Sequence, residues 1–264
     1  MFMILARLLS VVVAFNSCAA HSDRLLWPEG KHAAIVLTYD DALRSQLKVA
    51  IPQLNEARLK GTFFVDGDIT REDMIAWRAA AREGHELGNH SIFHPCPRAF
   101  FEDREHYATE NYDPPTMLAE INVMNNLLFG IDGKDVRTYS YPCSQSIVGG
   151  VDYTDALRRS AMIRYARIGG DQYTAVVSEP HKLDEYRVPS WGFMDKPDGA
   201  QLIAYVKRVQ ESGGLGVLQF HGVGGDYLEV SAHAHRELLR YLTEHPDIWV
   251  DTFRAVMDHI VAVR

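Results

Sequence analysis

Cysteine, basic clusters and long apolar runs are all scarce in this chain. Its 264 residues include three cysteines, and its formal net charge at pH 7 is −8. Without a Lys- or Arg-rich run, the surface is not suited to follow the phosphates of DNA or RNA, so we expect no nucleic-acid partner. The apolar stretch at residues 8–15 is shorter than a membrane span, which requires about 20 residues, so we expect no transmembrane helix.

The N-terminus has the layout of a secretory signal peptide. Arg7 precedes the apolar stretch, and small residues occupy positions 17–20. We expect residues 1–20 to be removed and the protein to be exported to the periplasm or the extracellular space. Two alternatives stay open. One is lipid attachment at Cys18, which would anchor the protein to a membrane surface, and the other is a buried apolar N-terminal segment.

Residues 30–264 show one continuous pattern without a repeat, a low-complexity tract or a linker, so we expect a single domain there. Short runs of β-branched or aromatic residues alternate with amphipathic segments. Strands are predicted at residues 33–38, 62–65, 136–141, 163–168, 186–189, 215–220 and 248–250, and helices at 43–57, 72–82, 117–128, 153–161, 198–209, 234–242 and 253–261. About seven β-then-α units in one domain favour a parallel barrel. The predicted fold class is α/β, a distorted and incomplete (β/α) barrel.

Functional side chains of such barrels gather where the strands end. The first predicted strand ends at Asp40 and Asp41, whose side chains point apart on extended backbone and can take different roles. A third strand leads into His90 and His94. If these residues form one helical turn, both imidazoles lie on one side and can share a divalent cation. A later strand delivers His221 to a glycine-rich loop.

Each of these signals has an ordinary explanation when taken alone. Adjacent aspartates often form a solvated turn or a helix cap. Paired surface histidines explain a four-residue spacing about as often as a metal site does, and a lone histidine is usually structural. Their shared location at strand ends is what favours a functional site.

Together these segments resemble the NodB-type polysaccharide deacetylases, the fourth carbohydrate esterase family, over nearly the whole chain after the signal. Residues 39–42, Tyr-Asp-Asp-Ala, match the family's first motif, T-F-D-D-G, with Ala42 at the glycine position. Residues 90–94 match H-[ST]-x-x-H, and His221 matches the histidine of the last motif. The predicted strand that includes residues 61–65, Gly-Thr-Phe-Phe-Val, is also typical of the family.

The resemblance implies a divalent metal held by Asp41, His90 and His94. It also implies that Asp40 is the general base and His221 the general acid. One carboxylate and two neutral imidazoles would leave open positions for water and an acetyl oxygen, and the metal would lower the pKa of that water toward about 7. Zinc is the expected ion, and cobalt, nickel or iron would suit the same ligands.

The chain departs from the family in its third and fourth motifs. Ser140 and Cys143 replace the arginine and the aromatic residue of R-x-P-[FY], and Ser190 replaces the aspartate that precedes the tryptophan of the fourth motif, here Trp191. The family uses this arginine and aspartate to orient and tune its base and acid. Losing one alone would leave a buried charge unpaired at a cost of about 3–5 kcal/mol, so their joint replacement by serines is physically sensible.

Three arginines are candidates to replace the missing charge, and the sequence does not choose among them. They are Arg164, Arg167 and Arg187.

Removal of the signal would leave Cys96 and Cys143 as the two thiols, and an oxidising compartment permits a bridge between them. Cys96 lies two residues after His94, and Cys143 lies in the motif that lines the same cleft in the family. We expect a disulfide, which would contribute about 4 kcal/mol in the chain-entropy model. Two buried free thiols are the alternative.

The resemblance also assigns Tyr141, Cys143 and Trp191 to the substrate groove or to stabilisation of the oxyanion. Residues 95–115 form a long aromatic segment without a clear period, and a loop of this length is usually functional. We expect its aromatic residues to form a groove wall that stacks on sugar rings, with core packing as the alternative for each of them. They are Phe100, Phe101, Tyr107 and Tyr112, with Trp191 and Phe193 opposite.

The predicted function is metal-dependent hydrolysis of acetyl groups on a polysaccharide or oligosaccharide. N-acetyl groups of N-acetylglucosamine polymers or oligomers are the leading substrates, and O-acetyl esters of acetylxylan-like polysaccharides are the alternative. A carbohydrate-binding protein that has kept the barrel and lost turnover is an alternative of another class, motivated by the missing arginine and aspartate. A related barrel that hydrolyses a cyclic amide is disfavoured by the signal peptide.

Overall fold

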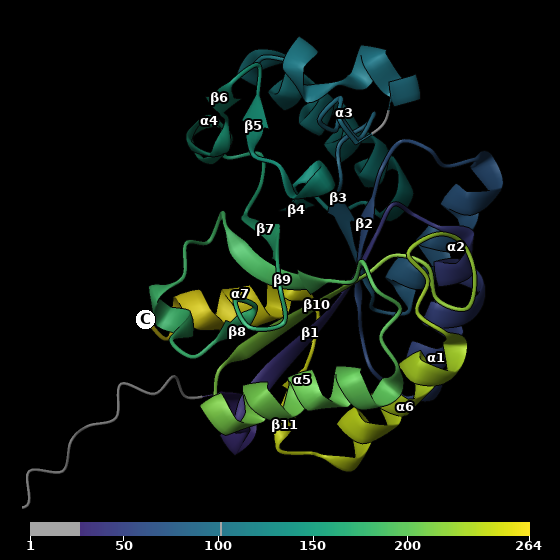
Figure 1. Cartoon of the computed structure of the whole chain (residues 1–264), viewed down its shortest axis with the longest axis vertical. Helices are drawn as coiled ribbons and strands as arrows, with labels where there is room; N and C mark the ends of the chain where they lie inside the picture. The colour runs from purple at the N-terminus through teal and green to yellow at the C-terminus, as the bar shows by residue number, and fades with distance from the viewer. Residues whose placement is uncertain (1–26, 101) are drawn as a thin grey trace, which may run out of the picture.

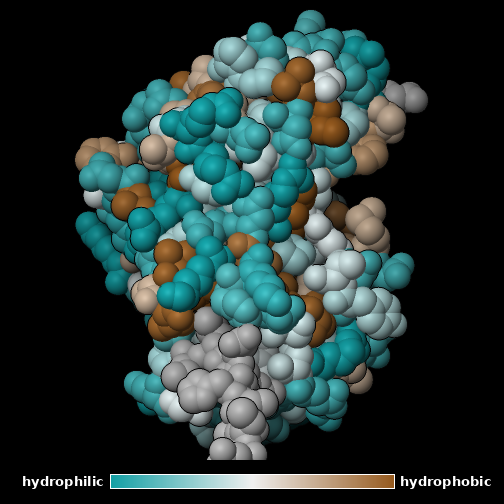
Figure 2. All heavy atoms as spheres, turned by 90° about the vertical axis from the view of Figure 1, so that its left-hand side faces the viewer, coloured by the Kyte–Doolittle hydropathy of each residue, from teal (hydrophilic) through white to brown (hydrophobic). Residues whose placement is uncertain are grey.

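The computed structural model describes residues 27–100 and 102–264. The signal peptide predicted for residues 1–20, with the alternative lipidation site at Cys18, lies outside them. Among the described residues, no helix is both long and apolar enough to cross a membrane. On the face in Figure 2, apolar side chains occur in small groups separated by hydrophilic ones, so this face offers no broad apolar contact surface.

Seven parallel strands close into a barrel, which confirms the predicted fold class (Figure 1). They are β1 (Ala33–Asp40), β2 (Thr62–Val65), β3 (Glu86–Asn89), β4 (Thr138–Ser140), β7 (Tyr165–Gly170), β9 (Val188–Gly192) and β10 (Leu215–Phe220). Each pairs with the next in this order, and β10 pairs back with β1 to complete the barrel. Two short strands flank this ring: β11 (Ile248–Val250) lies parallel to β1, and β8 (Val176–Val177) lies antiparallel to β10.

A small hairpin of β5 (Ile147–Val148) and β6 (Val151–Asp152) has no counterpart among the predicted elements. Its strands are two residues long, which is too short to produce a periodic pattern. Gly149 and Gly150 form the turn with φ of 53° and 78°, in the left-handed region that favours glycine.

Helices surround the barrel, most of them following a strand as predicted. They are α1 (Ile51–Glu56), α2 (Arg71–Arg82), α3 (Pro114–Asp132), α4 (Thr154–Ser160), α5 (Gly199–Ser212), α6 (Ala232–Glu244) and α7 (Phe253–Ala262). Local sequence sets their ends: Thr70 and Asp73 form a capping box at the start of α2, and Gly213 ends α5 with φ of 67°. The first helical amide of α7, from Phe253, donates to Thr62 at 2.8 Å, so α7 closes the end of the barrel where the strands begin.

The helix predicted at residues 43–57 forms at residues 44–56 and contains a π-helical turn. The π-helical turn occupies Gln46–Ala50 and precedes α1, and Pro52 in the first turn of α1 lacks a backbone donor. The buried side chain of Gln46 donates to the backbone oxygen of His221 at 3.1 Å. The turn therefore ties the segment after β1 to the loop after β10, and π turns of this kind are frequent at functional sites.

Alternation along the strands assigns each side chain either to the barrel interior or to the layer beneath the helices. On β1, Ala34 and Val36 share a core cluster with α7, whereas Ile35 and Leu37 belong to the cluster beneath the other helices. The interior rows end, where the strands end, in one hydrogen-bonded layer of polar side chains: Asp40 on β1, Ser140 on β4, Arg167 on β7, Ser190 on β9 and Gln219 on β10.

His235 on α6 is a buried titratable group in the layer between the barrel and the helices. Its Nε2 lies 2.7 Å from the hydroxyl of Tyr39, and its Nδ1 lies 2.7 Å from Oε1 of Gln53. Burial, with the charge of Arg236 as a second cause, lowers the pKa of His235 to about 3. The folded protein therefore keeps this imidazole neutral at mildly acidic pH.

We expect His235 to make folding stability fall below pH 6.5. The unfolded state takes up the proton near pH 6.5 and the folded state only near pH 3, so protonation favours unfolding by about 2 kcal/mol at pH 5. His235→Gln retains hydrogen-bonding capacity but cannot titrate. Urea unfolding between pH 6.5 and pH 5 should show a smaller pH dependence in this variant than in the wild type, and equal pH dependence would contradict the prediction.

Candidate active site

A cavity of about 1200 Å³ opens where the barrel strands end. It gathers side chains from the ends of β1, β2, β3 and β10 and from the loops that follow them. Six of the eight site residues assigned from the sequence line it: Asp40, Asp41, His90, His94, Cys143 and His221. Residues far apart in the chain therefore share one cavity, as expected for functional side chains at strand ends.

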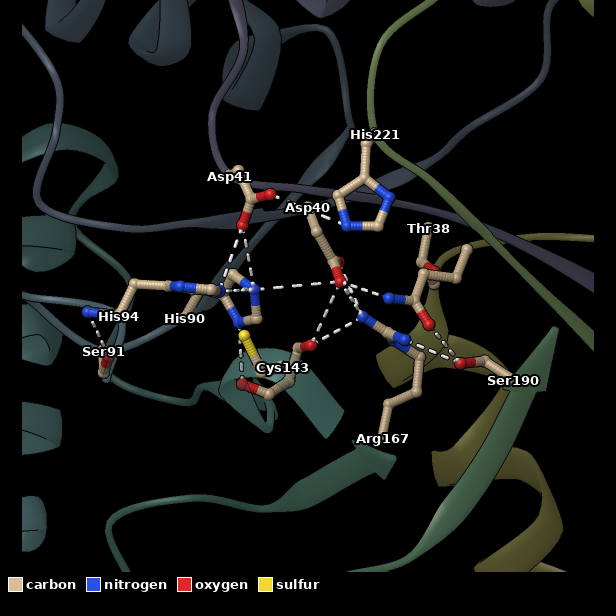
Figure 3. A network of polar contacts seen from close by, with 12 residues as sticks. Thr38, Asp40, Asp41, His90, Ser91, His94, Cys143, Arg167, Ser190 and His221 are labelled. Atoms are coloured by element: carbon tan, nitrogen blue, oxygen red, sulfur yellow. Dashed lines mark hydrogen bonds and ion pairs between the residues drawn. The ribbon is translucent and has the colours of Figure 1, made fainter. Parts of the chain in front are cut away.

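Three candidate ligand atoms converge in this cavity (Figure 3). Oδ1 of Asp41 lies 3.2 Å from Nε2 of His90 and 3.3 Å from Nε2 of His94, and the two nitrogens are 3.2 Å apart. Atoms this close to one another can all bind one cation at about 2.1 Å. Oδ1 of Asp41 is also buried and has no hydrogen-bond partner among the described residues. An orphaned carboxylate oxygen facing two imidazoles fits a divalent metal.

The surroundings prepare these side chains for a cation. Burial opposes ionisation of Asp41, but His90, His94 and His221 hold the pKa of Asp41 well below its ordinary range. Nδ1 of His90 lies 2.8 Å from the backbone oxygen of Ser140. Because a carbonyl only accepts, this contact places the proton on Nδ1 and leaves Nε2 free to bind a metal.

Residues 90–94 do not form the helical turn that was considered for them. Ser91 and His94 have φ of 61° and 49°, so the chain forms an irregular loop. The backbone amide of His94 donates to the hydroxyl of Ser91 at 3.0 Å, and the amide of Ser91 donates to Oδ1 of Asn89 at 2.7 Å. The four-residue spacing does bring both imidazoles together, but side-chain hydrogen bonds within a loop achieve this.

The chain also leaves β1 through left-handed backbone. Asp41 and Ala42 have φ of 72° and 51°. This conformation favours glycine, which explains the glycine of the family motif at the position of Ala42. Alternation alone would point Asp41 away from the interior, and the left-handed backbone instead brings its carboxylate to the cavity, so the two neighbouring carboxylates face different partners.

Asp40 is held by Arg167, and both residues are 1% exposed. Nη2 of Arg167 lies 2.6 Å from Oδ1 of Asp40. The same guanidinium donates to the hydroxyls of Ser140 and Ser190, each at 2.6 Å. Gln219 adds a donor to Oδ2 of Asp40 at 3.0 Å. The two serines that replace family residues are therefore hydrogen-bond partners of an arginine from another strand.

Of the three candidate arginines, Arg167 is the one that reaches the site. Arg164 pairs with Asp258 at 2.7 Å near the surface, and Arg187 contacts Asp152. Ser140 on β4 and Arg167 on β7 are register neighbours. The positive charge of the family motif thus lies one strand further along the barrel, at the same height.

His221 lies on the other side of the Asp41 carboxylate, with its Nε2 3.6 Å from Oδ2 of Asp41. Its Nδ1 is buried and has no hydrogen-bond partner among the described residues. No side chain within this part of the chain therefore replaces the family aspartate as an acceptor for His221. The hydroxyl of Tyr227, in the loop after β10, donates to Oδ2 of Asp41.

Three other polar residues of the site were not anticipated from the sequence. Gln219 contacts Asp40, Tyr227 contacts Asp41, and Asp66 lines the cavity at the end of β2. Burial, reinforced by the charge of Asp41, raises the pKa of Asp66 to about 7. None of the three belongs to a recognisable motif, although the strand-end positions of Asp66 and Gln219 were signals that pointed to them.

The predicted disulfide between Cys96 and Cys143 is present, with the two Cα atoms 5.6 Å apart. It joins the loop that contains His94 to the turn after β4. Sγ of Cys96 also lies 3.5 Å from Nδ1 of His94. The bridge therefore limits the movement of the His94 loop.

Two residues assigned to the groove do not line the cavity. Because Ser140 and Ser190 face the interior, strand alternation turns the next residues, Tyr141 and Trp191, outward. Tyr141 packs against Tyr139 and Tyr153, and Trp191 against Phe193 and Tyr205.

Part of the predicted aromatic wall does line the cavity. Phe100 and Tyr107 contribute to it, together with Phe93, whose ring stacks on Tyr107 with centroids 4.8 Å apart. Tyr112 is instead buried in a core cluster. Phe101 lies outside the described residues.

We expect the protein to bind one divalent ion per chain and the His94→Ala variant to lose this ion. Mutating a residue that only supports a metal ligand usually costs 10–100-fold in metal affinity, so removal of a ligand should cost more than about 100-fold. Chelator competition, with elemental analysis of the purified protein, measures this. His32→Ala, at an exposed histidine before β1, is the matched control and should bind metal like the wild type. Full metal retention in His94→Ala would contradict the ligand assignment.

Known proteins are similar to this chain in sequence. The sequence profile of the family described as polysaccharide deacetylase matches residues 28–161. The chain is 27% identical over 128 residues to the peptidoglycan-N-acetylmuramic acid deacetylase PdaA of Bacillus subtilis, and the alignment covers 48% of this chain and 44% of PdaA. The matched region spans less than half the length of PdaA and of two further curated relatives.

Solved structures show the same fold. A putative polysaccharide deacetylase from Mycobacterium smegmatis has a TM-score of 0.64 at 18% identity, covering 90% of this chain and 93% of that one. A CE4 family pseudoenzyme from Bacillus anthracis has a TM-score of 0.53 at 15% identity, covering 86% and 66%. The family profile extends over just over half of this chain and includes Asp41, His90 and His94. The chain therefore belongs to the polysaccharide deacetylase family.

Proposed function

We propose that this protein is an exported, metal-dependent hydrolase that removes acetyl groups from a saccharide. N-acetyl groups of N-acetylglucosamine polymers or oligomers are the leading substrates, and zinc is the leading metal. The observation that carries the proposal is the convergence of a three-ligand cluster and a buried, arginine-held carboxylate on one large cavity. Family membership supports the chemistry, and the N-terminal sequence supports export.

Asp41, His90 and His94 would hold the metal, which when bound would activate water and polarise the acetyl carbonyl. Asp40 lies beside this cluster, with Oδ2 3.8 Å from Nε2 of His90. Arg167 occupies one side of the Asp40 carboxylate and fixes its orientation. Asp40 is thereby positioned to take a proton from the attacking water, as a general base must be.

His221 faces Oδ2 of Asp41, whereas His90 and His94 face Oδ1, and His221 is positioned to protonate the departing amine or alcohol. A backbone amide has to support the oxyanion that forms at the carbonyl. The amide of Tyr141 is already bonded to the backbone oxygen of Arg167 at 3.1 Å. Cys143 lines the cavity two residues later, and we assign the oxyanion-binding role to its amide.

Hydrolysis of O-acetyl esters on acetylxylan-like polysaccharides remains the alternative within the same chemistry. N-acetylmuramic acid in peptidoglycan, named for PdaA, is a further substrate to compare. Saccharide binding without turnover is the alternative of another class. The absence of a partner for Nδ1 of His221 among the described residues favours it, and one similar structure is described as a pseudoenzyme.

We expect the zinc-loaded protein to release acetate from an acetylated glycan. Asp40→Asn should keep the metal but lower kcat at least about 100-fold, because a general base contributes 10²–10⁴-fold to the rate. Chitin oligomers, peptidoglycan and acetylxylan form the substrate panel. Asp135→Asn makes the same change at an exposed residue before β4 and should retain activity. Full metal occupancy and saccharide binding with no acetate from any substrate would instead support binding without turnover.

We expect Arg167→Ser to lower kcat and to destabilise the fold by about 3–5 kcal/mol, because it leaves the buried Asp40 charge unpaired. Adding Ser140→Arg should restore part of both losses, since the new guanidinium starts from the neighbouring strand at the same height. Acetate-release kinetics and urea unfolding measure the two effects. Arg164→Ser, which breaks a surface ion pair, is the control and should change stability by less than about 1 kcal/mol. Unchanged kcat in Arg167→Ser would refute the positioning role.

A further inference from the structure

Asp66 and Asp68, just after β2, line the cavity but have no part in the proposed chemistry. Asp66 is 8% exposed, whereas Asp68 is exposed to solvent. Within the described residues, the Asp66 carboxylate accepts a hydrogen bond from the amide of Asp68 at 3.1 Å. Neither carboxylate forms an ion pair with a residue in the described part of the chain. Asp68 therefore presents negative charge to whatever occupies the cavity, and Asp66, whose pKa burial and the charge of Asp41 raise to about 7, does the same above that pH.

The position of Asp66 beside the metal cluster is fixed by the backbone. On β2, Thr62 and Phe64 face the barrel interior. Because side chains alternate along a strand, Asp66, two residues after Phe64, lies on the same side. The amide of Gly67 donates to the backbone oxygen of Ile92 at 3.1 Å, within the loop between the two histidine ligands. A Cβ at Gly67 would lie 2.3 Å from that oxygen, so the two loops are in close contact.

These two carboxylates determine the charge of the cavity wall. The charged residues other than histidine that line it, among those described, are all aspartates: Asp40, Asp41, Asp66 and Asp68. Arg167 neutralises Asp40. A divalent metal would bring two positive charges, of which Asp41 neutralises one and Asp66 the other, so the charge of Asp68 leaves this wall net negative. The rest of the wall is largely apolar or aromatic and includes Phe93, Phe100, Tyr107, Met194 and Leu228.

We propose that Asp66 and Asp68 select uncharged or cationic sugars and reject sugars that carry a carboxylate close to the acetamido group. Carboxylates accept hydrogen bonds from hydroxyl and ammonium groups but repel a second carboxylate, and partial burial strengthens both effects. The inference rests on the proposed deacetylase function and narrows its substrate class. Polymers of N-acetylglucosamine, including partly deacetylated ones with ammonium groups, are preferred over glycans of N-acetylmuramic acid or of acetamido uronic acids.

A pair of substrates that differ in this charge alone tests the proposal. One is a peptide-free oligosaccharide of alternating N-acetylglucosamine and N-acetylmuramic acid, and the other is the same oligosaccharide with its lactyl carboxylates converted to methyl esters. We expect the zinc-loaded protein to show at least about tenfold higher kcat/KM for the ester. Calorimetric titration of the same two compounds should give a difference in Kd of the same direction.

The variants identify the residues responsible. The double variant Asp66→Asn with Asp68→Asn should reduce the ratio of kcat/KM for the ester to that for the acid at least threefold. Asp68→Asn alone should reduce this ratio in part, and because the position is exposed, this variant can be tested even if the double variant folds poorly. Asp135→Asn, the control at a residue that does not line the cavity, should keep the wild-type ratio. Equal values for acid and ester in the wild type, or an unchanged ratio in both variants, would overturn the selection.

Failure of the proposed function can be distinguished from failure of the charge selection. If no substrate releases acetate, hydrolysis is refuted, but calorimetry still compares binding of the acid and the ester. Tighter binding of the ester would then support the charge selection, and equal binding would overturn it.

Discussion

The ion pair between Asp40 and Arg167 is the contact on which the mouth of this barrel depends. Both side chains are almost fully buried, and an unpaired charge at that depth is costly, so each requires the other. The hydroxyls of Ser140 and Ser190 accept from the guanidinium, and Gln219 supplies another donor to the carboxylate. Such an extended network lets a buried pair keep one geometry. It holds a carboxylate next to a cluster of candidate metal ligands without making it one of them.

Two features of β1 separate the roles of its adjacent aspartates. Strand alternation places Asp40 in the interior row, where Arg167 can reach it. Left-handed backbone at Asp41 then turns the next carboxylate toward His90 and His94. The division between base and ligand thus follows from strand alternation and from where the extended conformation stops, and a one-residue shift in the register of β1 would move Asp40 out of the interior row.

Much of the barrel and the ligand cluster could be predicted because their signals are local. Short runs of β-branched or aromatic residues located most of the strands, and the strand ends located Asp40, His90 and His221. The partner of Asp40 could not be chosen, because Arg164, Arg167 and Arg187 all lie near predicted strands and only the register of β4 against β7 distinguishes them. The groove assignments of Tyr141 and Trp191 failed for a related reason. The position of a residue in a motif does not show which face of the strand its side chain occupies.

The closed barrel explains how the positive charge beside Asp40 can come from β7 in this chain and from the position of β4 in the family motif. Interior positions at one height are near neighbours around the ring, so an arginine from β7 can fill the space that an arginine from β4 would occupy, provided that position 140 becomes small. Ser140 and Ser190 meet that condition and also bind the guanidinium. The missing family arginine is therefore weak evidence for lost turnover. The missing aspartate is stronger evidence, because Nδ1 of His221 has no replacement partner among the described residues. Whether the protein hydrolyses its saccharide or only binds it thus depends on the general acid, His221, rather than on the general base, Asp40.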